Sequence, residues 1–475
     1  MTNRFPAFLA LAAVAMLGGC NLAPKYARPA PAVPPTLAQD AGASRLAPTD
    51  APDISRIGWR DFFLDERLRR VIEIGLDNNQ DLRLAAANVL QARAQYRVQR
   101  AELLPAVNAN GTGTYTNTAS LAASGSSAGA GTADIQYFTA NVGISSFEID
   151  LFGRIRNLSK AALEQYFATE EAQRAARVTL IGEIASAWLT LASDRDQLAI
   201  AQRTLTAFEQ SLELTRAQFR IGVASELESQ QAETSYQSAR NDIATLRTRI
   251  AQDVNALQLL TGAPLADDLL PEGLADRPVA IDMLPGDLSS AVLLRRPDVL
   301  QAEHQLIAQN ANIGAARAAF FPSISLTATA GAISPALGSL FGSNTGTYTV
   351  SPSVSMPLFD FGRNKSNLDS ARALREGAVA SYQKAIQTAF REVSDALAQR
   401  GTIDEQIAAQ TARAKAAETA AKLSDARYRA GVESFLTALD SQRSAYSAEQ
   451  ELVTTRLGRA NNLVTLYRTL GGGLK

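Results

Sequence analysis

The chain contains one pattern of motifs twice, and this internal repeat constrains its fold more than any other feature of the sequence. Three residues of the first half, Arg100, Leu104 and Pro105, match Arg317, Phe321 and Pro322, which lie 217 positions further along. Later motifs recur after 209 positions: Phe152-Gly153-Arg154 as Phe361-Gly362-Arg363, and Gly222-Val223 as Gly431-Val432. Because the order and spacing persist over most of the 475 residues, we expect two copies of one structural unit.

The offset between matching motifs falls by eight between Pro105 and Phe152, so the first half contains extra residues there. The Ser-, Gly- and Ala-rich segment 117–134 is expected to hold this insertion as a loop. The expected division is a first repeat over 58–265, a linker over 266–286 and a second repeat over 287–475.

Each repeat is expected to run through the same series of elements. A helix ends before a proline, because proline disfavours helical geometry at the preceding residue. Two strands follow, then a helix of roughly 65 residues, near 100 Å long at 1.5 Å per residue, and a return helix. The expected ranges are 66–103, 107–116, 137–149, 155–220 and a return helix to 261 in the first repeat, and 287–320, 323–333, 347–359, 364–429 and a return helix to 470 in the second.

A strict seven-residue spacing marks the long helix of the first repeat. Its members are Ile184, Leu191, Leu198, Leu205, Leu212 and Phe219. Because an α-helix has about 3.6 residues per turn, this spacing keeps one seam facing a partner only in a left-handed supercoil. The helix alone fits a soluble coiled-coil rod equally well, so the strands decide the architecture.

The strand segments alternate as membrane-crossing strands do. Ile324 and Leu326, for example, alternate with Ser325 and Thr327, and a tilted strand of about 9–11 residues crosses a bilayer. Four strands cannot close a barrel, and lipid does not tolerate open edges, so further copies of the chain must supply the rest. Three copies would give twelve strands and an aqueous lumen, whereas two would give eight and a nearly filled interior. We expect a homotrimer, with a dimer as the weaker alternative.

The N-terminus has the features of an export signal over residues 1–19. Arg4 precedes an apolar run that is too short to cross a bilayer as a stable helix. The run ends in Leu17-Gly18-Gly19-Cys20, which resembles a bacterial lipobox. The resemblance implies that Cys20 carries diacylglycerol and N-palmitate, and Asn21 after it favours the outer membrane. An ordinary signal peptide with an incidental cysteine is the alternative. Residues 20–57, rich in Pro and Ala, are expected to form an extended lipidated tether.

The composition argues against catalysis. One cysteine and one histidine leave few groups for metal clusters or acid–base chemistry. The chain has 46 Lys and Arg against 47 Asp and Glu, so it has no excess of positive charge that would indicate binding of nucleic acid. We expect a protein that is not an enzyme, with no metal, no cofactor other than the lipid, and no nucleic-acid partner. The C-terminal run Gly471-Gly472-Gly473-Leu474-Lys475 is expected to be a frayed end.

Several motifs together resemble one known family. They are the lipobox, Gly58-Trp59-Arg60-Asp61-Phe62-Phe63, the run 150–154, the run 359–363 and the two Gly-Val turns. In this order they are similar to the outer-membrane efflux proteins, the TolC-like channel-tunnels, and to their lipoprotein (NodT-like) branch that serves resistance-nodulation-division (RND) transporters. The resemblance implies a mainly α fold with a membrane β part, a trimeric 12-stranded β-barrel continued by a long periplasmic α-helical coiled-coil barrel.

The same resemblance implies a function and its partners. The chain would be the passive exit channel of a tripartite pump in a Gram-negative outer membrane. It would receive drugs and other small toxic compounds from an inner-membrane RND transporter through a periplasmic adaptor. A type I protein secretion channel and a pore-less periplasm-spanning structural lipoprotein are the alternatives.

Two places in the sequence match functional regions of the family. The stretch 439–443 matches the periplasmic constriction, so the resemblance implies a gate of Leu436, Asp440 and Arg443. The alternative is that Asp440 lies on a solvated face and pairs with Arg443 one turn on. The turns Gly222-Val223 and Gly431-Val432 match the tip that docks the adaptor. Their glycines are also expected as helix C-caps, and Ser225 with Glu228 as a capping box opening the return helix.

Overall fold

The computed structural model describes residues 21–37, 57–117, 134–274, 279–281 and 289–473. The chain divides into two compact units. Unit 1 comprises the residues up to Pro29, Val89–Thr169 and Ala302–Ser381, and unit 2 comprises Ala30–Asn88, Glu170–Gln301 and Tyr382–Lys475. Of the expected signal peptide and tether, residues 1–20, which include Cys20, and residues 38–56 lie outside the described residues.

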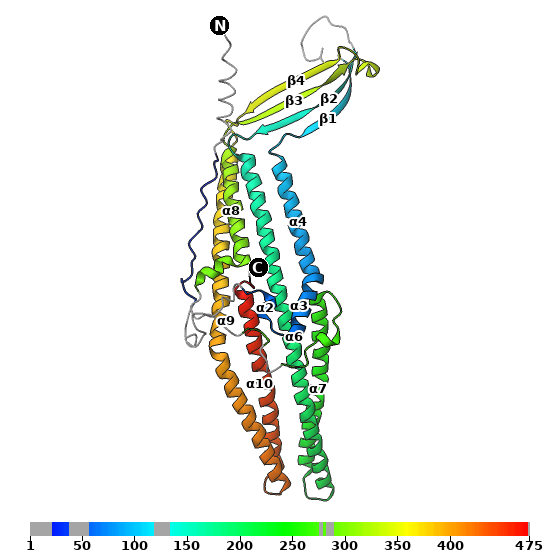
Figure 1. The fold of residues 1–475 in the computed structure, drawn as a ribbon, viewed down its shortest axis with the longest axis vertical. Helices are drawn as coiled ribbons and strands as arrows, with labels where there is room; N and C mark the ends of the chain where they lie inside the picture. Colours follow the sequence, from blue (N-terminus) through cyan, green and yellow to red (C-terminus); the bar gives the residue numbers. More distant parts are fainter. Residues whose placement is uncertain (1–20, 38–56, 118–133, 275–278, 282–288, 474–475) are drawn as a thin grey trace. The chain divides into compact units, whose positions relative to one another are not determined.

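Unit 1 contains the single sheet of the described chain. Its strands are β1 (Val107–Asn117), β2 (Asp134–Ile149), β3 (Ser323–Ser334) and β4 (Gly346–Ser355). The spatial order is β1-β2-β3-β4 with every pair antiparallel, so the repeats meet where β2 pairs with β3 (Figure 1).

The structure corrects the expected place of the eight-residue insertion. Val107 lies opposite Ile144 in the first hairpin, and Ile324 lies opposite Val354 in the second. Val107 corresponds to Ile324 in the repeat, so the two hairpins can be compared directly. The comparison places seven of the eight extra residues between the strands β1 and β2. The eighth is a β-bulge in β2 between Ile144 and Phe147, where Ser146 has φ 54°. A bulge adds one residue to one strand without changing the composition, so the sequence gives little sign of it.

The strand expected over 347–359 ends at Ser355, where it lies opposite the first residue of β3. Residues 356–359 have no strand beside them within the described chain. Their counterparts at the end of β2, Phe147–Ile149, lie beside β3 and are strand. The early end of β4 therefore reflects a missing neighbour.

The first helix of each repeat is shorter than expected. In the first repeat it is broken into α3 (Glu66–Asn78) and α4 (Gln80–Ala101). Asn79 is buried at the break, where its side chain accepts from the backbone N–H of Leu82 and donates to the carbonyl of Leu260. In the second repeat a 3₁₀ turn, η4 (Ser290–Arg295), precedes α8 (Pro297–Ala318). Proline at the first helical position fixes that start.

The long helices are α6 (Arg154–Arg220) and α9 (Arg363–Arg429), and the return helices are α7 (Glu226–Thr261) and α10 (Phe435–Thr469). In unit 2, α6 lies beside α7 and α9 beside α10 (Figure 1). The seven-residue seam is a packing seam: Ile184, Leu191 and Leu212 are buried, although Phe219 at its end is half exposed. Near the end of α6, Phe208 and Leu212 pack with Ala232 and Ala239 of α7 and with Phe435 and Leu439 of α10.

The expected helix ends are confirmed. Gly222 and Gly431 have φ of 79° and 77°, the left-handed geometry that ends a helix without steric cost only at glycine. Ser225 and Glu228 form the capping box at the start of α7. Among described helices, α6 is long and apolar enough to cross a membrane by length and composition, but half of its most apolar window is buried against the protein, as in a core helix.

Residues 21–29 lie along α8 in unit 1. Glu303 of α8, only 6% exposed, accepts hydrogen bonds from Tyr26 and from both the Nε and an Nη of Arg28. Further along the helix, Asn310 donates to the carbonyl of Pro24 and Arg317 to that of Leu22. This part of the expected tether is therefore docked on the protein by specific polar contacts.

The expectation of a frayed glycine tail is wrong. Gly471, Gly472 and Gly473 are buried in unit 2, and Tyr467 donates a hydrogen bond to the carbonyl of Gly472. A Cβ at Gly473, whose φ is 62°, would lie 1.9 Å from the carbonyl oxygen of Ile57. The glycines are needed because the backbones approach closely with left-handed geometry.

Replacing Gly473 by Ala is therefore expected to lower stability by roughly 2 kcal/mol or more, because the methyl group overlaps backbone at a strained φ. Gly458→Ala is the matched control: it lies in α10 with no atom closer than 3.9 Å to an added Cβ, and alanine favours helix. Thermal inactivation rates should rise for Gly473→Ala and fall or stay unchanged for Gly458→Ala. Equal rates for the two variants would contradict the docked tail.

Candidate functional site

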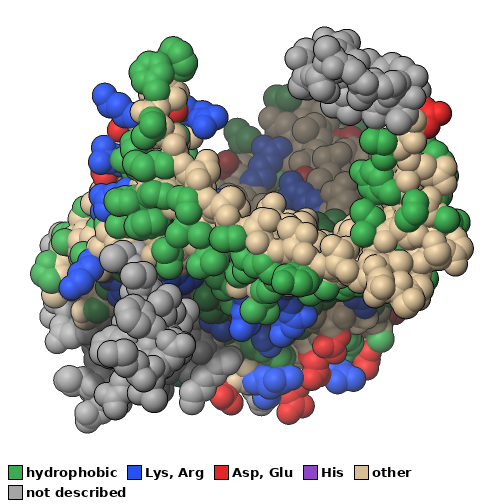
Figure 2. All heavy atoms as spheres, turned by 90° about the horizontal axis from the view of Figure 1, so that it is seen from above, with side chains coloured by type: hydrophobic (Ala, Val, Ile, Leu, Met, Phe, Trp, Pro, Cys, Tyr) green, Lys and Arg blue, Asp and Glu red, His purple; other side chains and the backbone are tan. Residues whose placement is uncertain are grey.

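The register of the sheet sorts its side chains onto two faces of opposite character. One face is almost wholly apolar. Its members include Val107, Ala109, Tyr115, Phe138, Ala140, Val142, Ile144, Ile324, Leu326, Ala328, Ala330, Tyr348, Val350 and Val354, and its polar exceptions include Asp134, Gln136 and Ser334. Many of these large side chains are exposed, and Figure 2 shows hydrophobic side chains gathered along one side of the sheet.

The opposite face carries mainly small polar side chains, with Ile135, Tyr137 and Ile333 as larger exceptions. Its members include Asn108, Asn110, Thr112, Thr114, Thr139, Asn141, Ser325, Thr327, Thr329, Thr347, Thr349, Ser351 and Ser353. An exposed apolar face on strands of 10–16 residues suits lipid, and a face of hydroxyls and amides suits water. The two faces of the sheet therefore differ in the surroundings that they suit.

The two Gly-Val turns join long and return helices in unit 2. Val223 is 73% exposed and Val432 64%, while the glycines beside them cap α6 and α9. Tyr428 of α9 donates a hydrogen bond to the side chain of Gln218 of α6. This bond joins the two long helices close to the residues where their turns begin. Each turn therefore presents an exposed valine beside a helix end, and the first turn also exposes Ile221.

The three expected gate residues lie on the first three turns of α10. Leu436 and Asp440 are exposed, whereas Leu439 between them is buried against α6 and α7. Arg443 donates from Nε and Nη2 to the hydroxyl of Ser235 of α7, at 3.1 and 2.7 Å, rather than to Asp440. The structure thus does not show the pairing expected from the spacing of Asp440 and Arg443, and their gate role stays a prediction.

Other contacts between the repeats were not evident from sequence. Tyr446 of α10 donates to Asp242 of α7 at 3.0 Å, and burial raises the pKa of Tyr446, so its hydroxyl keeps the proton that it donates. Glu449 of α10 pairs with Arg203 of α6 at 3.1 Å. Their partners lie 204 to 246 positions away, and no local spacing signals such pairs. We call the contacts of Arg443, Tyr446 and Glu449 the cross-repeat bonds.

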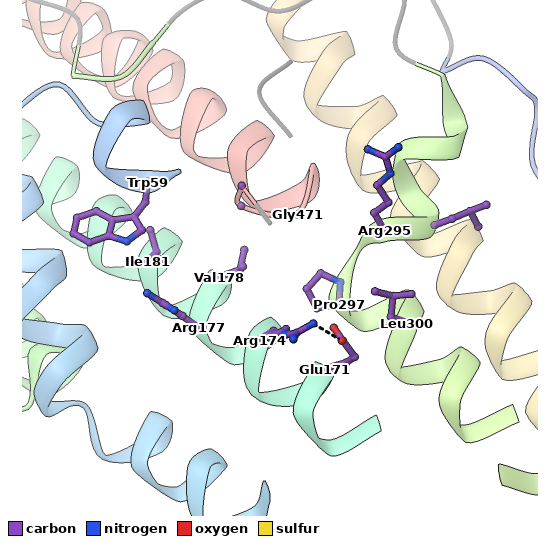
Figure 3. A pocket seen from close by; sticks show the side chains of 13 residues that line it. Trp59, Glu171, Arg174, Arg177, Val178, Ile181, Arg295, Pro297, Leu300 and Gly471 are labelled. Atoms are coloured by element: carbon purple, nitrogen blue, oxygen red, sulfur yellow. Dashed lines mark hydrogen bonds and ion pairs between the residues drawn. The ribbon is translucent and has the colours of Figure 1, made fainter. Parts of the chain in front are cut away.

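A cavity of about 440 Å³ lies elsewhere in unit 2, between α6, the start of α8 and the glycine tail. Figure 3 shows Arg174 directed at Glu171, with which it forms an ion pair of 2.6 Å, and Arg177 and Arg295 directed away from each other. The arginines do not converge on one point, as an anion site requires. Within the described residues, no three His, Cys, Asp or Glu side chains could hold a metal ion.

Two carboxyl groups meet between α6 and α7. Asp194 is buried, and its side chain interacts with that of Asp253, one oxygen of which is buried without a hydrogen-bond partner. Burial and the neighbouring carboxylate raise the pKa of Asp253 to about 6, while Arg249 alone opposes them. Burial also raises the pKa of Asp194. Such a pair holds one proton between two oxygens.

This pair predicts a pH-dependent stability. Because the pKa of Asp253 is higher in the folded chain, its proton stabilises the fold below pH 4, and this contribution is lost as the pH rises through 6. Asp253→Asn should therefore stabilise the protein at pH 7.5 by about 1–2 kcal/mol and change little at pH 4.5. Thermal inactivation at the two pH values measures this, with exposed Glu209→Gln of α6 as control. An equal effect at both pH values would contradict the shared proton.

The class of protein follows from these features together. A sheet with one lipid-compatible and one water-compatible face, attached to helices of 67 residues, belongs to a membrane channel with a long helical extension. The chain matches the family model for outer membrane efflux proteins over residues 71–263 and 288–472, and it belongs to that family.

Relatives and solved structures agree over nearly the whole chain. It is 42% identical over 474 residues to the probable efflux pump outer membrane protein TtgC of Pseudomonas putida, covering 98% of this chain and 95% of that protein. It is 40% identical to the cation efflux system protein CusC of Escherichia coli, with coverage of 96% and 97%. The open state of the MtrE outer membrane channel of Neisseria gonorrhoeae superimposes with a TM-score of 0.83 at 37% identity, covering 96% of this chain and 99% of MtrE.

The expected family is thereby confirmed. The chain is an outer-membrane component of an efflux pump, as its motifs and strand pattern predicted.

Proposed function

We propose that three copies of this chain form one passive exit channel, a 12-stranded barrel in the outer membrane continued by a helical barrel in the periplasm. The two-faced sheet with unpaired edge strands carries this proposal. Two copies would close a barrel of eight strands, and side chains would nearly fill its interior. Three copies leave an aqueous lumen. The polar face, with its Ser, Thr and Asn side chains, would line that lumen.

The channel would receive its cargo through a periplasmic adaptor from an inner-membrane RND transporter. The Gly-Val turns are the proposed docking tips, because each offers an exposed apolar side chain beside a helix end, which suits packing against a partner helix. Drugs and other small toxic compounds are the proposed cargo. Relatives are named for toluene and solvent efflux and one for cation efflux, and a wall of small hydroxyl groups selects little among such compounds.

Closure would take place at the turn end of the helices. Asp440, exposed on α10, would meet its two symmetry-related copies, and the cross-repeat bonds would hold α10 inward against the first repeat. Leu436, one turn earlier, would narrow the passage. Three like charges close together repel one another and attract cations, so the closed state would respond to both pH and ionic conditions.

The N-terminus would anchor the assembly through diacylglycerol and N-palmitate on Cys20. The neighbouring residues support this anchor, since Asn157 at the start of α6 donates to the side chain of Asn21 at 3.0 Å. The chain leaving Cys20 is thus held close to the junction of sheet and helix in unit 1, where the apolar face of the sheet ends.

Conductance in planar bilayers tests the proposal. The purified protein should have the native mass of three chains and show discrete, mostly closed conductance steps. Asp440→Ala should retain the steps and lose their dependence on divalent cations, and Asp425→Ala, at an i,i+4 ion pair on α9, serves as control. Silence of the wild type and of Asp440→Ala at every voltage and pH would favour a pore-less structural lipoprotein instead.

A further inference from the structure

A cavity of about 300 Å³ lies in unit 1, where β2 and β4 end and β3 and α9 begin. Ser323 and Ser355 line this cavity and lie opposite each other in the sheet. They continue the alternation of Ser325 and Ser353, which belong to the polar face. The cavity therefore lies on the polar side of the sheet, and its volume is at the lower end of the range for small-molecule sites, about 300–1,000 Å³.

Three of the charged side chains that line the cavity belong to the first repeat and are neutralised there. Glu148 accepts hydrogen bonds from Nε and Nη2 of Arg154 at 2.8 and 2.6 Å. This two-bond geometry is the strong form of a carboxylate–guanidinium pair. Asp150 accepts from the backbone N–H and from Nε of Arg156 at 2.8 and 3.3 Å. Two carboxylates and two guanidinium groups thus leave no net charge.

The fourth charged side chain of the cavity, Arg363, comes from the second repeat. It corresponds to Arg154, because the motifs of this region recur after 209 positions. Pro357 stands where the first repeat has Glu148, and it also lines the cavity. A proline side chain has neither a charge nor a hydrogen-bond acceptor, so the second repeat retains the cation of the pair and lacks its carboxylate.

Asp360 is the carboxylate nearest to Arg363 in the sequence, and it has another role. Its two oxygens accept from the backbone N–H groups of Gly362 and Asn364 at 3.0 and 2.9 Å, and they cap the start of α9. Within the part of the chain that the structure describes, Arg363 forms no ion pair, and its side chain is exposed. The cavity therefore contains one guanidinium group that is available to a ligand.

We propose that this cavity binds a small organic anion, with the carboxylate of the ligand on Arg363 and its apolar part against Phe321 and Pro322. A free guanidinium presents a planar fork of donors that matches the two oxygens of a carboxylate. Phe321 is 42% exposed although it stacks on Phe152, with ring centroids 4.7 Å apart, so it leaves an aromatic surface open to the ligand.

This inference deepens the proposed function and rests on it in one respect, because the polar face would line the passage. A ligand on Arg363 would then be a compound in transit, held where the strands give way to the long helices. The residues of the site all come from one chain. Binding can therefore be measured separately from passage.

Binding of benzoate to the purified full-length protein tests the site. Saturation-transfer NMR compares benzoate with benzamide, a neutral molecule of nearly the same shape. Benzoate should bind the wild type about fivefold or more tightly than benzamide, and Arg363→Ala should remove this difference because it removes the charge. Arg372→Ala is the matched control and should keep it, since Arg372 is exposed on the same helix and donates to Asp369 one turn back at 3.2 Å.

A second pair of variants tests the comparison of the repeats without removing the cation. Pro357→Glu restores the carboxylate that the first repeat has at this position, so it should occupy Arg363 and weaken benzoate binding as much as Arg363→Ala does. Pro357→Gln has the same size without the charge and should still bind. Wild-type affinity in either Pro357→Glu or Arg363→Ala overturns the site, and equal affinity for inorganic phosphate and benzoate overturns the apolar part of the ligand.

Single-channel recording separates the site from the passage. Benzoate should reduce the wild-type current in a concentration-dependent way, and Arg363→Ala should lose this effect. Binding that leaves the current unchanged supports the site and overturns its place in the passage. A protein that binds benzoate through Arg363 but shows no conductance supports the site while contradicting the proposed channel, so the two proposals can fail separately.

Discussion

Removing the hydrogen bonds of Arg443 and Tyr446 is expected to open the channel at least tenfold more often than in the wild type. In the double variant Arg443→Ala and Tyr446→Phe, α10 loses its bonds to Ser235 and Asp242 of α7. A hydrogen bond to a charged group contributes roughly 1.5–3 kcal/mol, less where water competes, and about 1.4 kcal/mol corresponds to a tenfold change in a population. Three copies lose both bonds at once, which increases the effect.

Single-channel recording measures the open probability directly. Arg413→Ala is the matched control, since Arg413 is exposed on α9 and its side chain bonds only one turn back on its own helix, to Gln410. Ser235→Ala should act like Arg443→Ala because it removes the other end of the same bond. If the double variant stays as closed as the control, these bonds do not hold the gate.

Replacing Cys20 by Ser is expected to remove the lipid completely. A hydroxyl differs from a thiol in nucleophilicity and acidity, so serine does not substitute at a site that forms a thioether. The mass of the mature wild-type protein should exceed that of its polypeptide by diacylglycerol and one palmitate, and metabolic labelling with palmitate should be lost in Cys20→Ser.

The contacts of residues 21–29 predict what survives this change. Glu303 and Asn310 hold the segment through Arg28 and Pro24 without any lipid, so the variant should still fold and assemble. Asn157→Ala, which removes the bond to Asn21, is the control that should keep its lipid. An unmodified wild type would show that the N-terminus is an ordinary signal peptide, and continued labelling of Cys20→Ser would show that the lipid is attached elsewhere.

Much of the fold was predictable because short-range sequence patterns determine it. The seven-residue seam, the glycines at the helix ends and the alternation of the strands each act through neighbouring residues, and the repeat shows them twice. The starts of α6 and α9 were expected within one residue. The register of the sheet then confirmed that the alternation separates an apolar from a polar face.

The features that escaped prediction depend on distant residues. Asn79 breaks a helix because its amide reaches the carbonyl of Leu260, and Gly473 is buried because Ile57 lies against it. Arg443 had a near candidate, Asp440, but bonds to Ser235, which is 208 positions away. Only the start of α8 had a readable local signal, since Pro297 disfavours helical geometry at the residue before it.

The equal lengths of α6 and α9, 67 residues each, limit how such a protein can change in evolution. One inserted residue advances a helix by about 1.5 Å and turns everything beyond it by about 100°. An insertion in α6 alone would rotate its seven-residue seam away from α7. It would also displace the Gly-Val turn after α6 along the helix axis relative to the turn after α9. We therefore expect changes in the length of these helices to be whole heptads. The same change should occur in all four of α6, α7, α9 and α10.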